Sequence, residues 1–161
     1  MLTIDDRSTR DIDDAIEVHE SEEGWLVNVA IADAAKRVTP GSEHDLEARS
    51  RGATRYFATG NSPMLPRDLA EEKLSLWPHK HKNTILIQMR LSPDLQVFWK
   101  GLNVGTICSA VKLSYEEIPE ILKLPDNAYY GQISAAKKLA FQLLEKRRAN
   151  GSMVFYDLNN G

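Results

Sequence analysis

An acidic stretch near the start of the chain, residues 3–15, constrains the fold more than any other feature. Five aspartates fall within ten positions there, and aliphatic residues flank them on both sides. Carboxylates crowded in this way repel one another and raise each other's pKa unless a cation lies between them. The stretch must therefore keep its acids next to water or a cation while its aliphatic residues enter a core. The aspartates are Asp5, Asp6, Asp11, Asp13 and Asp14.

Two interpretations of this stretch are open from the residues alone. A hard divalent cation takes oxygen ligands, and magnesium usually takes one or two carboxylates and completes its shell with water and substrate phosphates. Asp11 and Asp13 share a face if the segment is extended, because side chains alternate along a strand. The alternative is a solvated acidic loop, since charge runs usually face water. The aliphatic flanks are typical of a segment that runs into a core, and they favour the metal site.

Length and composition are those of an ordinary globular domain. The chain has 161 residues, of which 42% are hydrophobic and 27% charged, and its net charge of -3 is not typical of a stand-alone nucleic-acid binder. No apolar run approaches the roughly 20 residues that a membrane-spanning helix needs. The lone Cys108 excludes an intramolecular disulfide and favours a reducing, cytoplasmic compartment. It lies in an apolar run, so we expect a buried side chain.

Alternating apolar residues predict strands that tight turns join into a largely antiparallel sheet. A turn at residues 21–24, with Gly24 free to take a positive φ, connects the first two strands. A break at Gly105 separates two later ones. The predicted strands are residues 15–20, 25–31, 83–91, 95–102, 106–113 and 153–158.

Helix signals occur between and after these strands. Ser42, with Asp45 three residues later, resembles a capping box and begins a helix whose apolar stripe extends to Tyr56. A second capping box, at Ser114 and Glu117, begins a short helix. The remaining predicted helices cover residues 66–74 and 132–148. Together the elements predict an α+β (mixed α/β) fold, with two or three helices packed on the sheet.

Several side chains have two possible roles each. Tyr56 and Phe57 either stack on the bases of a single strand or belong to the core. Arg55 belongs to a basic group with Arg49 and Arg51, which either contacts phosphate or forms a solvated face. Asp33 follows a strand and either reaches into a site or forms a turn.

His79 and His81 are separated by one residue, a spacing at which two imidazoles can bind zinc. No cysteine or acid lies close by in the sequence, so we expect a solvated loop instead.

The order of these segments resembles the catalytic region of the ribonuclease II family, also called the RNB family, which includes ribonuclease R. The resemblance is strong from residue 3 to about residue 115 and loose beyond, and several motifs in register are more specific than any one alone. The motifs are TIDDRSTRDIDDA at 3–15, VAIADAA at 29–35, GSEHDLEARSRGATRY at 41–56, PMLP at 63–66, LSL at 74–76 and LSY at 113–115.

The resemblance implies a hydrolytic exoribonuclease that uses magnesium, trims single-stranded RNA from its 3′ end and releases nucleoside 5′-monophosphates. It implies that the four catalytic, metal-binding aspartates are Asp5, Asp11, Asp13 and Asp14, whereas Asp6 falls where the family pattern varies. We expect Asp13 or Asp14 to orient or deprotonate the attacking water. The resemblance also implies that Tyr56 stacks on the 3′-terminal base, and we expect Arg55 beside it to bind RNA.

The family's catalytic region is longer than this chain, with an arginine-containing motif in its later portion and OB-type RNA-binding domains on either side. We therefore expect residues 1–161 to be a single partial RNB catalytic domain, inactive or weak in isolation. Single-stranded RNA is the expected partner, and no membrane is expected. The alternatives are a non-catalytic RNA-binding or regulatory module with a structural acidic cluster, and an unrelated metal-binding protein such as a phosphatase.

Overall fold

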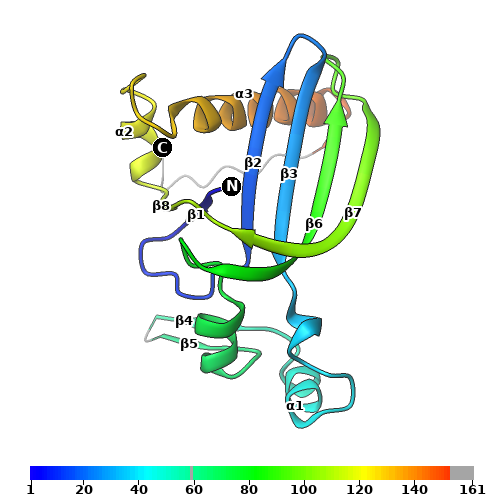
Figure 1. The fold of residues 1–161 in the computed structure, drawn as a ribbon, viewed down its shortest axis with the longest axis vertical. Helices are drawn as coiled ribbons and strands as arrows, with labels where there is room; N and C mark the ends of the chain where they lie inside the picture. Colours follow the sequence, from blue (N-terminus) through cyan, green and yellow to red (C-terminus); the bar gives the residue numbers. More distant parts are fainter. Residues whose placement is uncertain (59, 153–161) are drawn as a thin grey trace.

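A four-stranded antiparallel sheet is the largest element of the protein, with the strand order β2-β3-β6-β7 (Figure 1). The computed structural model describes residues 1–58 and 60–152. The sheet and its helices confirm the predicted α+β fold, whereas the predicted strand at 153–158 lies outside the described residues. The four strands are β2 (Asp14–Ser21), β3 (Gly24–Ala32), β6 (His81–Leu91) and β7 (Val97–Cys108).

The hairpin between β2 and β3 has the predicted turn. Ser21 pairs with Gly24 across a two-residue loop, and Gly24 has a φ of 117°. A Cβ atom at Gly24 would lie 2.0 Å from the carbonyl oxygen of Leu91, so glycine is required there both for conformation and for space.

The predicted break at Gly105 is wrong, because β7 continues through it. Gly105 pairs with Thr84 and the ladder to β6 extends as far as Cys108. Backbone hydrogen bonds hold this ladder, so it tolerates a residue without a side chain. Cys108 is exposed rather than buried, because it lies on the last strand of the sheet in this order.

A separate two-stranded parallel ladder joins β1 (Thr3–Asp5) to β8 (Lys112–Ser114). The predicted strand at 106–113 is therefore divided between the end of β7 and the start of β8. The prediction that Ser114 caps the next helix, α2 (Glu117–Ile121), is wrong, because Ser114 belongs to β8. Its N–H instead donates to the Glu117 carboxylate at 2.7 Å, so one half of the capping box forms.

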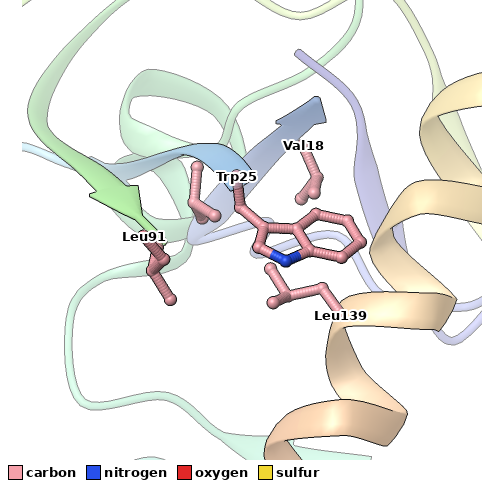
Figure 2. Close-up of a cluster of buried hydrophobic side chains, with 5 residues drawn as sticks. Val18, Trp25, Leu91 and Leu139 are labelled. Carbon is pink, nitrogen blue, oxygen red and sulfur yellow. The ribbon is translucent and has the colours of Figure 1, made fainter. Parts of the chain in front are cut away.

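The long helix α3 (Tyr130–Ala149) packs on one face of the sheet and confirms the helix predicted at 132–148. Leu139 of α3 lies against the ring of Trp25 from β3, with Val18 and Leu91 around them (Figure 2). A second cluster connects α3 and α2 to the β1–β8 ladder, through Leu2, Leu113, Ile121 and Ile133.

The remaining elements lie beyond one end of the sheet (Figure 1). They are the 3-10 helix η1 (Ala34–Lys36), α1 (Glu43–Arg51), β4 (Arg55–Phe57), β5 (Gly60–Ser62) and the π-helix η2 (Asp68–Leu74). No helix in the described ranges is long and apolar enough to cross a membrane.

Helix α1 begins as predicted and ends earlier. The Ser42 hydroxyl accepts a hydrogen bond from the Asp45 N–H at 3.3 Å, which confirms the cap. Gly52 then ends the helix in the left-handed conformation, with a φ of 75°. The predicted stripe to Tyr56 is wrong for this reason, and Tyr56 instead lies in β4, which pairs with β5 as a hairpin.

Candidate active site

The acidic stretch forms a loop between two strands. Asp5 is the last residue of β1 and Asp14 is the first residue of β2. The two strands are tied together at Leu2 and Ile16, whose backbones exchange hydrogen bonds of 2.9 and 2.8 Å. The strand ends therefore fix both ends of the acidic loop.

The segment that follows η2 holds the middle of this loop. The Ser75 hydroxyl donates to the carbonyl of Arg10 at 2.6 Å and accepts from the N–H of Ile12 at 3.1 Å. The N–H of Leu76 donates to the carbonyl of Ile12 at 2.9 Å. Ile12 is fully buried, so the loop is anchored by its one aliphatic residue between the acids.

Asp6 has a local role that separates it from the other four aspartates. Its carboxylate accepts hydrogen bonds from the N–H of Ser8 at 2.8 Å and from the Ser8 hydroxyl at 2.5 Å. These bonds hold the pKa of Asp6 below its usual value. Asp6 is therefore a turn-forming residue.

A pocket of about 730 Å³ opens beside the loop, and its lining brings the four predicted aspartates together with Tyr56. Residues from the acidic loop, the β4–β5 hairpin and η2 line it. They include Asp5, Asp11, Asp13, Asp14, Tyr56, Phe57, Asn61, Arg10, Arg67 and Glu71.

The charges of neighbouring acids in the pocket affect one another's pKa values. Burial raises the pKa of Asp13, and the charges of Asp11, Asp14 and Asp5 raise it further. Burial and the charges of Asp14 and Asp11 also raise the pKa of Asp5, against the opposing effect of Lys112. Burial raises the pKa of Asp14. Asp13 and Asp14 are exposed residues that line the pocket, so a solute can reach them.

This donor set fits a hard divalent cation. Carboxylates that raise each other's pKa are stabilised by a positive charge between them. No three His, Cys, Asp or Glu side chains among residues 1–58 and 60–152 are grouped to hold one ion by themselves. A cation here would take one or two carboxylates and complete its shell with water and substrate phosphates, as is usual for magnesium.

Two exposed aromatic side chains from β4 also line the pocket. Tyr56 is 74% exposed and Phe57 60% exposed, so the alternative that they belong to the core is wrong. Burial raises the pKa of the Tyr56 hydroxyl, and so do the charges of Asp11 and Asp13. Arg55 is exposed in the same strand and does not line the pocket.

The other polar residues considered as site candidates lie outside the pocket lining. Asp33 is buried and accepts a hydrogen bond from the N–H of Lys36 at 3.2 Å, so it forms a turn. Arg49 pairs with Asp45 at 3.0 Å along α1. His79 and His81 are both exposed, as expected, but only His79 lies in a loop, because His81 is the first residue of β6.

Sequence reasoning did not single out the charged lining residues other than the aspartates, namely Arg10, Arg67 and Glu71. Arg67 and Glu71 are four positions apart just after Pro66, a spacing that pairs opposite charges on a helix. That signal was available in the sequence, but it does not indicate which cavity the pair faces.

Comparison with known proteins decides the family. The RNB domain family matches residues 1–160. The chain belongs to this family. Exoribonuclease 2 of Yersinia pestis is 32% identical over 169 residues, which cover 97% of this chain and 25% of that protein. The RNB chain described here thus spans about a quarter of the length of the curated relatives that it matches.

Solved structures of other proteins share the fold. RNase R of Mycoplasma genitalium, in complex with ribose methylated single-stranded RNA, has a TM-score of 0.88 and 26% identity, over 95% of this chain and 25% of that one. Yeast Ssd1, a pseudonuclease, has a TM-score of 0.76 and 22% identity, over 91% of this chain and 18% of that one. At this identity the likeness to Ssd1 concerns the fold alone.

Proposed function

We propose that this RNB domain is part of a magnesium-dependent hydrolytic exoribonuclease. The enzyme degrades single-stranded RNA from the 3′ end and releases nucleoside 5′-monophosphates. The observation that supports this most is that Asp5, Asp11, Asp13 and Asp14 line the same pocket as the exposed ring of Tyr56. The relatives named exoribonuclease 2 support the reaction class.

Asp5, Asp11, Asp13 and Asp14 would supply the metal ligands, with one or two carboxylates on an ion and water and substrate phosphates completing its shell. When bound, magnesium supplies Lewis-acid stabilisation of the charge on the attacking and leaving oxygens of the phosphodiester. Asp13 or Asp14 orients or deprotonates the attacking water. A general base works best when its pKa lies near the operating pH, and the raised pKa values of both residues move them in that direction.

Tyr56 stacks on the 3′-terminal base, and Arg55 contacts the RNA backbone outside the pocket. Stacking tolerates any base, because every base has a π face. The exposure of Tyr56 supports this role, since a ring that is 74% exposed contributes little to the core. The RNase R complex with single-stranded RNA supports the choice of partner.

A cytoplasmic location is part of the same proposal. Cys108 is exposed and unpaired as a thiol, a state that a reducing compartment preserves.

The test is a degradation assay on a 5′-labelled single-stranded oligoribonucleotide with magnesium or with EDTA. It uses the 161-residue chain, the longest natural version of the protein and Asp13→Asn forms of both. We expect stepwise shortening from the 3′ end and 5′-monophosphate release by the long form, reduced by Asp13→Asn at least about 100-fold. Binding without release by the long form would overturn the proposal and favour a non-catalytic RNA-binding module.

A further inference from the structure

We propose that Arg10 and Arg67 form a phosphate-binding subsite for the RNA backbone in this pocket, and that Glu71 positions both guanidinium groups. The inference rests on the proposed function, because it takes RNA as the ligand. It assigns a role to the cationic side of a pocket that is otherwise acidic.

One carboxylate connects the two arginines. The Nε of Arg10 lies 3.2 Å from Oε2 of Glu71, and Nη1 of Arg67 donates to Oε1 of the same carboxylate. The Glu71 side chain is only 13% exposed, whereas the Arg10 and Arg67 side chains are 65% and 56% exposed. The carboxylate is thus largely enclosed, and the two cations remain accessible to a solute.

Further contacts fix these groups before any ligand arrives. Nη2 of Arg67 donates to the carbonyl of Asn61 at 2.9 Å and to its side-chain oxygen at 2.7 Å. The indole N–H of Trp77 donates to the carbonyl of Glu71 at 2.8 Å. Arg67 is therefore tied to both the β4–β5 hairpin and η2, which is the preorganisation that a binding residue needs.

The charges also favour an anion at this place. Two guanidinium groups and one carboxylate leave one net positive charge, which matches a single phosphodiester. Without a metal the four aspartates repel RNA, and the two guanidinium groups offset part of that repulsion. A guanidinium presents five donors in a fork that fits phosphate oxygens, and the contacts to Glu71 and Asn61 do not use all of those donors.

Stability alone does not explain this arrangement. Both arginine side chains are more than half exposed, so solvent screens their ion pairs with Glu71 and these pairs add little to the stability of the fold. Their shared position in the lining of the pocket is better explained by a ligand.

The experiment measures binding of a fluorescent single-stranded oligouridylate to the 161-residue chain by anisotropy, in EDTA and over a series of salt concentrations. The variants are Arg67→Ala, Arg10→Ala and Glu71→Gln. The matched control is Lys73→Ala, which removes one cation from the same helix η2, where Lys73 pairs with Asp68 at 2.7 Å and does not line the pocket. Melting temperatures confirm that each variant is folded.

We expect Arg67→Ala and Arg10→Ala each to weaken binding about 3- to 10-fold. Glu71→Gln should also weaken binding, because the carboxylate no longer holds the two guanidinium groups in place. The slope of log Kd against log salt should decrease by about 0.7 for each arginine removed. Lys73→Ala should change neither quantity. Arg10→Ala keeps the proposal testable if Arg67→Ala does not fold.

Equal effects of Arg67→Ala and Lys73→Ala would overturn the subsite, and so would an absence of binding by the unmodified chain at low salt. Failure of the proposed function gives a different result. In that case oligouridylate binds and responds to Arg67→Ala, while the longest natural version releases no monophosphate with magnesium.

Discussion

At the scale of single residues, the charge of Asp13 opposes folding when no cation is bound. Burial and three neighbouring acids raise its pKa in the folded state above the unfolded value. The folded protein then binds the proton more tightly than the unfolded chain does. Stability from this group is fully present below the unfolded pKa and decreases as the pH rises through the folded pKa. At neutral pH the ionised Asp13 is therefore destabilising.

The first prediction follows from this sign. Asp13→Asn should raise the melting temperature in EDTA at neutral pH by about 1–2 °C, a small effect because the side chain is exposed to solvent on one side. Differential scanning fluorimetry measures it, with Asp126→Asn, an exposed acid outside the pocket, as the control. A lower melting temperature for Asp13→Asn would contradict the account.

The second prediction concerns the ring of Tyr56. Tyr56→Ala should weaken binding of a single-stranded oligoribonucleotide by about 5- to 100-fold, the usual effect of losing one base stack. Tyr56→Phe keeps the ring and should retain most of the affinity. Neither change should lower the melting temperature much, because the side chain is 74% exposed. Equal losses in both variants would show that the hydroxyl, and not stacking, carries the affinity.

At the scale of elements, the acidic loop depends on the segment after η2. Ser75 is fully buried and satisfies one carbonyl and one N–H of the loop, at Arg10 and Ile12. Ser109 makes a comparable buried bond, from its hydroxyl to the carbonyl of Leu76 at 2.8 Å, so its hydroxyl bonds to the segment after η2 and not to the loop itself. Comparing variants of the two serines therefore distinguishes an effect on the stability of the core from an effect on the geometry of the site.

The third prediction uses this pair. Ser75→Ala and Ser109→Ala should each lower the free energy of unfolding by about 1–3 kcal/mol, because each leaves a buried polar group unpaired. Only Ser75→Ala should also weaken magnesium binding, since it releases the loop that holds Asp11 and Asp13. Urea unfolding and calorimetric titration measure the two effects. Equal magnesium affinities in both variants would refute the role of Ser75 in positioning the loop.

At the scale of the whole molecule, metal binding and folding are linked through the acidic pocket. A cation that binds only the folded protein stabilises it by an amount that grows with its concentration relative to Kd. Protons compete for Asp5, Asp13 and Asp14, and the raised pKa values of these groups bring that competition above the ordinary aspartate pKa of about 3.9.

The fourth prediction is that magnesium raises the melting temperature at about pH 7 and raises it less at about pH 5. EDTA should reverse the gain, and Asp13→Asn should reduce it at the higher pH. Thermal unfolding with and without magnesium at both pH values measures this. A gain that is the same at both pH values would place the cation away from these carboxylates.

Local patterns in the sequence were enough to predict much of this protein. The turn at Gly24, the Ser42 cap and the helix now seen as α3 depend on residues within a few positions of one another. Such signals survive in the fold because the backbone contacts that they describe are themselves local. The motifs at residues 3–15 and 41–56 also indicated which aspartates and which tyrosine to consider.

Only the tertiary structure decided which of these local elements contact one another. It brings Tyr56 on the β4–β5 hairpin to the same pocket as the aspartates, leaves Arg55 outside the lining, and adds Arg10, Arg67 and Glu71. It also carries β7 through Gly105 and exposes Cys108. Pairing between distant strands and the packing that covers a face are long-range properties, and no periodicity of two or 3.6 residues specifies them.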